Sequence, residues 1–97
     1  MKIFIISSNE KELSGIAALL HERHAGDDID SAIGSLERLS GTAEMAAPDV
    51  LLLAQAEISE ADLARIERLA SRLPGMAIIV QCQQQGADFL RLAMRAG

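Results

Sequence analysis

Aromatic residues are nearly absent from this sequence, which has two phenylalanines and neither tryptophan nor tyrosine. Its core must therefore be built from leucine, isoleucine, valine, alanine and methionine. Cysteine occurs once, at Cys82, so no intrachain disulfide can form. A reducing cytoplasm is the natural compartment for such a chain.

Long apolar runs and clusters of positive charge are also missing. The N-terminal apolar run stops at residue 6, so it is too short for a secretory signal and far too short to span a bilayer. The formal net charge is −5, whereas non-specific nucleic-acid binding needs clustered lysine and arginine. We expect a soluble domain that neither inserts directly into a membrane nor binds nucleic acid.

What the sequence does contain is the composition of an ordinary globular domain, with 49% hydrophobic and 24% charged residues. A chain of 97 residues is enough for one small core and too short for two. We therefore expect a single domain over residues 1–97.

Four segments repeat one pattern, in which an apolar run is followed by a polar turn and an amphipathic helix. Runs 2–6, 49–53 and 77–80 are typical of buried strands, and a short, charged edge strand is expected over 29–32. The order βαβαβαβα predicts a parallel sheet with right-handed crossovers and helices on both faces. The fold class is α/β: a three-layer, flavodoxin-like sandwich with strand order 2-1-3-4.

Each of the first three helices has a start signal, a side chain that can accept a hydrogen bond from the backbone of the first turn. The expected caps are Asn9 with Glu12, Ser35, and Ser59 with Asp62. We expect the first helix to end with Gly26 as the glycine just beyond its C-cap. A fourth helix is expected over residues 86–96.

A binding site is expected beyond the carboxyl ends of the strands, between the first and third, where the strand order reverses. The residues that follow the strand ends there are Ser7, Ser8, Asn9, Ala54, Gln55, Gln81 and Cys82. Magnesium binds hard oxygens, normally carboxylates among them. Glu10 and Glu57 lie past the strand ends, where side chains usually face water, so we expect neither a metal nor a cofactor.

The stretches "KIFIISSNEKEL", "PDVLLLAQAE" and "AIIVQCQQQGADFLRLAMRAG" together resemble a response-regulator receiver domain. Receivers carry two acidic residues after the first strand, a phosphoacceptor aspartate ending the third, and a threonine or serine after the fourth. Here Ser7 and Ser8 match the acidic pair, Ala54 the phosphoacceptor and Gln81 the hydroxyl residue. All four depart from the family pattern. Receivers also carry a lysine on a fifth strand that residues 1–97 do not reach, so we expect this chain to lack the receiver's fifth strand and helix. The resemblance implies a non-phosphorylatable domain that is not an enzyme.

Among receivers that have lost these residues, the sequence is similar to the N-terminal domain of the bacterial TadZ/CpaE pilus-assembly proteins, through "FLRLAMRAG" (89–97). That domain precedes a P-loop ATPase, so the resemblance implies that residues 1–97 are an N-terminal fragment of a longer protein. The resemblance implies a cytoplasmic interaction module that localises or assembles a type IV (Flp/Tad) pilus protein, recruited to the inner membrane or cell pole by its partners. The alternative is a phosphorylation-independent receiver of a response regulator with a DNA-binding or signalling output.

A receiver that uses Ser7 or Ser8 as its phosphoacceptor is disfavoured, because no carboxylate or base stands beside either hydroxyl in the sequence to activate it.

The expected last helix carries more apolar surface than packing on a sheet requires, since its polar residues occupy only a narrow arc. Its candidate interface residues are Phe89, Leu90, Leu92, Ala93, Met94 and Ala96. The fourth strand is expected to leave an exposed apolar edge, which invites pairing with another chain. We expect a homodimer formed through that edge or through the last helix, together with contacts to other pilus or signalling proteins. The alternatives for the apolar surface of the last helix are burial by the rest of the same chain and burial by a fifth strand and helix after residue 97.

Two further groups of residues have ordinary interpretations. His21 and His24 are one helical turn apart, but no third metal ligand accompanies them, so a favourable interaction with the helix dipole is expected. Arg65, Arg68 and Arg72 alternate with acidic residues, which predicts a solvated, self-paired face. The alternative for these arginines is a docking surface for an acidic partner.

Overall fold

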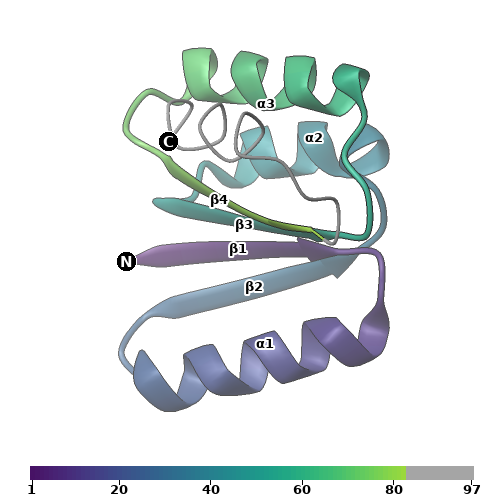
Figure 1. Ribbon diagram of the computed structural model, residues 1–97. Coiled ribbons are helices and arrows are strands. Elements are labelled where there is room, and N and C mark those ends of the chain that lie inside the picture. Colours follow the sequence, from purple (N-terminus) through teal and green to yellow (C-terminus); the bar gives the residue numbers. More distant parts are fainter. Residues whose placement is uncertain (83–97) are drawn as a thin grey trace.

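Strands and helices alternate along the chain, and the strands form one parallel sheet in the order β2-β1-β3-β4 (Figure 1). The computed structural model describes residues 1–82, except for the side chain of Cys82. The strands are β1 (Lys2–Ser7), β2 (Asp28–Ile33), β3 (Val50–Gln55) and β4 (Ala77–Cys82). The helices are α1 (Glu10–Arg23), α2 (Leu36–Ala46) and α3 (Glu60–Arg72). The predicted fold class and strand order are confirmed for this part of the chain.

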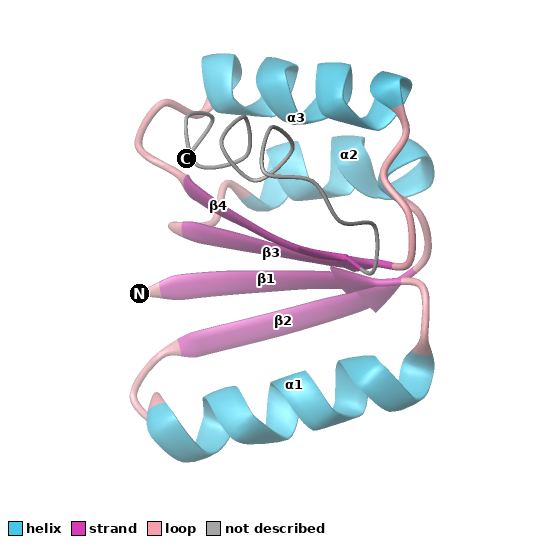
Figure 2. Ribbon diagram, in the orientation of Figure 1, coloured by secondary structure: helices cyan, strands magenta, loops and turns pink. Residues whose placement is uncertain are grey.

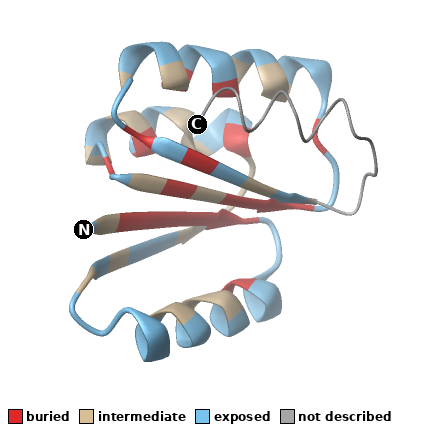
Figure 3. Ribbon diagram, turned by 60° about the vertical axis from the view of Figure 1, so that its left-hand side comes forward, coloured by how far each residue is buried: buried red, intermediate tan, exposed pale blue. Residues whose placement is uncertain are grey.

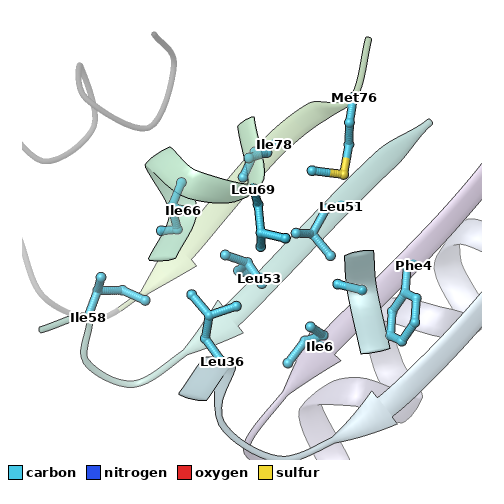
Figure 4. Close-up of a cluster of buried hydrophobic side chains, with 11 residues drawn as sticks. Phe4, Ile6, Leu36, Leu51, Leu53, Ile58, Ile66, Leu69, Met76 and Ile78 are labelled. Carbon is cyan, nitrogen blue, oxygen red and sulfur yellow. The ribbon is translucent and has the colours of Figure 1, made fainter. Parts of the chain in front are cut away.

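The helices divide between the two faces of the sheet, with α1 on one and α2 and α3 on the other (Figure 2). Because side chains alternate along a strand, each strand contributes to both faces. The face under α2 and α3 holds the larger core, drawn in Figure 4. Its buried members are Phe4, Ile6, Leu36, Ala43, Leu51, Leu53, Ile58, Ile66, Leu69, Met76 and Ile78.

The core on the α1 face is smaller, since only Ile3, Ile5 and Leu13 are buried there. Strand β1 is buried from Ile3 to Ser7, whereas β2, at one edge, has no buried residue (Figure 3). The short charged edge strand expected over 29–32 is therefore present as β2, longer by one residue at each end. None of the described helices has both the length and the apolar character needed to cross a membrane.

The expected N-caps are all present. Asn9 Oδ1 accepts from the backbone of Glu12 at 2.9 Å, and Ser35 Oγ accepts from that of Arg38 at 3.3 Å. At α3 the capping is reciprocal, because Ser59 Oγ accepts from the Asp62 N–H while Asp62 Oδ2 accepts from the Ser59 N–H. Local side-chain chemistry thus places the helix starts.

The expected end of α1 was wrong. The helix closes at His24, whose N–H donates to the Leu20 carbonyl at 2.7 Å, so Gly26 lies two residues beyond the cap. His24 has a φ of −131°, and this end of the helix therefore needs no left-handed residue. The left-handed cap occurs instead at Ala47, which ends α2 with a φ of 45°.

Strands β3 and β4 run further than the sequence pattern predicted. Ala54 and Gln55 belong to β3 rather than to the following loop, because β4 continues beside them to Cys82. The predicted helix over 86–96 lies outside the described residues. So do its candidate interface residues, Phe89, Leu90, Leu92, Ala93, Met94 and Ala96.

Candidate functional site

Four residues form one row across the sheet at its carboxyl edge. Ser7 of β1 is in register with Ile33 of β2 and with Ala54 of β3, and Ala54 is in register with Gln81 of β4. Ser7, Ala54 and Gln81, which the resemblance to receivers matches with phosphorylation residues, are therefore neighbours on adjacent strands. The structure places this row at the reversal of strand order, between β1 and β3.

The centre of this row is closed to solvent, since Ser7 is 0% exposed and Ala54 is 1% exposed. Ser7 Oγ donates to the Asn9 carbonyl at 3.1 Å and accepts from the Asn9 N–H at 3.2 Å. The Ser7 hydroxyl therefore shapes the turn that leads into α1. Ser8 and Gln81, by contrast, are exposed.

A hydrogen-bonded link joins the ends of β1 and β3 through the turn after β2. Gly34 N–H donates to the Ser7 carbonyl at 2.9 Å, and Gln55 Nε2 donates to the Gly34 carbonyl at 3.2 Å. Gln55 is only 8% exposed, so its amide is held inside this edge of the sheet. Sequence reasoning placed Gln55 at the site but missed its bond to Gly34; the glycine directly before the Ser35 N-cap was the available signal.

Gly34 is held in a conformation that favours glycine, with a φ of +154°. A Cβ atom at this position would lie 3.1 Å from Leu39 Cδ1, which is tighter than an ordinary contact. The turn can therefore pass between Ser7 and Gln55 because residue 34 has no side chain.

The chemical capacity of this edge is small. Glu10 and Glu57, the nearest carboxylates in sequence, are both exposed. Within residues 1–82 no three histidine, cysteine, aspartate or glutamate side chains are grouped so that they could hold a metal ion. The four residues of the row carry one hydroxyl that is bonded to backbone, one amide and two apolar side chains, so the row supplies neither an anionic nucleophile nor a base to activate the hydroxyl.

The two histidines and the arginines lie away from this edge. His24 Nδ1 is 3.4 Å from Asp27 Oδ2, and Asp27 Oδ1 also meets the Met1 ammonium at 3.2 Å. His21 lies in the last turn of α1, as the dipole interpretation requires.

The arginines of α3 are partly paired within the domain. Arg65 contacts Asp62 on its own helix at 2.9 Å, whereas Arg72 contacts Glu44 of α2 at 2.7 Å. The hydrogen bond and the charge of Glu44 raise the pKa of Arg72 above its usual value. Of the self-paired face expected from sequence, the Arg65–Asp62 pair is present, whereas Arg72 pairs with a different helix.

An open hollow of about 390 Å³ lies at the amino edge of the sheet. Its lining comprises Met1, Lys2, Gly26, Asp27, Asp28 and Asp49. Several of its polar groups bond within the protein: Asp49 Oδ2 accepts from the Lys2 N–H at 2.8 Å, and Lys2 Nζ donates to the Ala46 carbonyl at 2.6 Å. These bonds join the start of β1 to the end of α2 and to the residue that precedes β3.

Two solved structures are similar to this one. A protein from Burkholderia pseudomallei, described as pilus assembly-related, has a TM-score of 0.78 and 24% identity over 98% of this chain and 71% of its own. A protein from Burkholderia thailandensis, described as the pilus assembly protein CpaE, has a TM-score of 0.83 and 23% identity over 98% of this chain and 78% of its own. At this level of identity the similarity establishes a shared fold. No protein-family model and no curated protein matches the sequence.

Proposed function

We propose that this domain is a receiver-like protein-interaction module that helps to localise or assemble a type IV (Flp/Tad) pilus protein and forms a homodimer. The observation that carries the proposal is that two structures described as pilus-assembly proteins share the fold over 98% of this chain. Partners recruit the domain to the inner membrane or the cell pole.

The domain works without phosphorylation and is not an enzyme. Supporting this is the row at the carboxyl edge, where Ala54 is buried and the Ser7 hydroxyl bonds only to the backbone of Asn9 among the described residues. A phosphoryl group would meet neither a carboxylate acceptor nor a set of magnesium ligands there. Any change of state must therefore come from partner binding.

The β4 side of the sheet is the surface we assign to the pilus partner. The two edges of the described sheet differ in charge, since β2 carries Asp28 and Asp30 whereas β4 carries no charged residue. Charges on an edge strand prevent unwanted pairing, so an uncharged edge is suited to contact with another chain.

Apolar surface continues from this edge onto the face that carries α1. Ile79 of β4 is 52% exposed, and its neighbour in register, Leu52 of β3, is only half-buried. Helix α1 packs against β1 and β2, and so lies over the other half of this face (Figure 1). A partner that covers Ile79 and Leu52 would remove this apolar surface from water.

The test is the assembly of surface pili in the bacterium that encodes this chain, with Ile79→Lys introduced at the chromosomal locus. Met45→Lys is the matched control, because Met45 is an 89% exposed apolar residue on α2, away from β4. We expect Ile79→Lys to reduce piliation and Met45→Lys to leave it unchanged, with both proteins present at equal levels. Normal piliation after deletion of residues 1–97 would overturn the proposed function.

A further inference from the structure

Helix α1 is the single described helix on its face of the sheet, so its outer side is not covered by another described helix (Figure 1). Leu13 is buried, and Ile16, Ala17 and Leu20 are half-buried against the sheet. The opposite side of the helix consists of positions three or four residues apart, which share one face. These exposed positions are Lys11, Gly15, Ala18 and Glu22.

The middle of this outer side is uncharged and small, unlike a solvated helix face. Gly15 and Ala18 occupy it, flanked by Ser14 and by Leu19, which is 50% exposed. A glycine within a helix weakens it, and a Cβ atom at Gly15 would meet nothing within 4 Å. Within residues 1–82, packing therefore gives no reason for glycine at this position.

The midpoint of α1 lies between Ile16 and Ala17, and charged residues at equal distances on either side of it have opposite signs. Lys11 lies as far before this midpoint as Glu22 lies after it, and Gly15 and Ala18 are related in the same way. A two-fold axis at the midpoint, perpendicular to the helix, sets two copies of α1 antiparallel. Lys11 then faces Glu22 of the partner subunit at both ends of the contact, and Gly15 faces the partner's Ala18.

The two ends of α1 also carry complementary charges. The first turn of α1 carries Glu10 and Glu12, and its last turn carries His21 and Arg23. An antiparallel pair brings the acidic turn of one copy beside the basic turn of the other, and it also opposes the two helix dipoles. A parallel pair would instead bring charges of like sign together.

We infer that a second copy of this chain docks on the outer side of α1, in a two-fold symmetric, antiparallel contact centred on Gly15 and Ala18. The small central residues let the helices approach closely, Leu19 of each copy is covered beside the contact, and the Lys11–Glu22 pairs set the direction. Such an interface is closed by its own symmetry and produces a dimer. The inference rests on the homodimer of the proposed function and assigns it to α1, leaving the β4 side free for the pilus partner.

The inference is tested by reversing the charges at Lys11 and Glu22 in the 97-residue chain. Sedimentation at several concentrations then measures how strongly each variant dimerises. Lys11→Glu alone and Glu22→Lys alone each replace two attractions across the contact by two repulsions. Each should therefore raise the dissociation constant of the dimer about tenfold. An equimolar mixture of these two variants, and the double variant Lys11→Glu/Glu22→Lys, both restore opposite charges across the contact. Recovery of the dimer in both cases is expected; a reversal that fails to weaken the dimer, or that neither combination rescues, would overturn the inference.

A second pair of variants separates the contact from folding. Gly15→Gln should strengthen the isolated helix yet block the close approach, and thereby raise the dissociation constant of the dimer at least tenfold. Gly41→Gln is the matched control, because Gly41 is an exposed glycine within α2 whose Cβ atom would also meet nothing within 4 Å. It should leave the dissociation constant unchanged. Equal dimers in both variants would contradict a contact through α1.

Two outcomes distinguish a failure of the α1 contact from a failure of the homodimer. A dimer that persists in Gly15→Gln but is lost in Ile79→Lys would overturn the α1 contact and retain the homodimer. A chain that is monomeric at every concentration would overturn both the α1 contact and the homodimer of the proposed function.

Discussion

The side-chain amide of Gln55 donates a 3.2 Å hydrogen bond to the carbonyl oxygen of Gly34, and so ties the end of β3 to the turn between β2 and α2. The same glycine donates to the Ser7 carbonyl from its backbone N–H. In this fold the edge of the sheet where ligands usually bind is thus closed by an amide and a turn.

Replacement of Gln55 should weaken the domain without altering its fold. Gln55→Met keeps the length of the side chain but removes the donor to Gly34, and a lost hydrogen bond of this kind costs about 1 kcal/mol of unfolding free energy. Urea denaturation measures the loss. Gln81→Met is the control, since Gln81 is exposed on the neighbouring strand, and a loss of equal size there would argue against the Gly34 bond as the cause.

Gly34 should tolerate substitution poorly. Gly34→Ala places a Cβ atom 3.1 Å from Leu39 Cδ1 on a backbone with a φ of +154°, so we expect a loss of about 1–3 kcal/mol in unfolding free energy. Gly41→Ala should instead stabilise the domain by about 0.5–1 kcal/mol, because that glycine is helical and unobstructed. Thermal or urea unfolding of the two variants should therefore shift in opposite directions; a common direction would contradict this explanation.

The strands and the helix starts could be predicted because the signals for them are local. Apolar runs predict buried strands, and Asn9, Ser35 and Ser59 accept hydrogen bonds from residues three positions further along. That Ser7, Ala54 and Gln81 lie close together could also be predicted, because parallel strands bring their carboxyl ends to one edge of the sheet.

The bonds that close this edge could not be predicted in the same way. Gln55 and Gly34 are 21 residues apart in sequence, and whether they meet depends on how the turn after β2 packs. The length of β3 is likewise set by pairing, since Ala54 and Gln55 remain in the strand where β4 lies beside them. The end of α1 was predicted wrongly because glycine is the usual residue just beyond a helix C-cap, whereas the hydrogen bond from His24 ends α1 before Gly26.

Ala47 is a position where the domain can be stabilised. It ends α2 with a φ of 45°, in the left-handed region that costs an alanine roughly 1–2 kcal/mol and costs a glycine almost nothing. Ala47→Gly should raise the unfolding free energy by up to about 1 kcal/mol, because the added freedom of the unfolded chain offsets part of the gain. As control, Ala61→Gly at an exposed helical position of α3 should lower it by about 0.5–1 kcal/mol. A loss of stability in Ala47→Gly would contradict the strain assigned to this cap.

Exposure to a small phosphodonor with magnesium should leave the mass of the chain unchanged, because the buried methyl of Ala54 stands beside a Ser7 hydroxyl that is engaged by the Asn9 backbone. Intact-mass spectrometry measures this, and one phosphate per chain would contradict a phosphorylation-independent module.

Ala54→Asp alone should not restore phosphorylation, since Ser7 and Ser8 supply no carboxylate for a metal. It should instead destabilise the domain by about 1–3 kcal/mol, because a polar group enters a position that is 1% exposed. This loss should shrink as the pH falls and the new carboxyl group becomes neutral, so a loss that grows toward low pH would show that burial of the charge is not its cause.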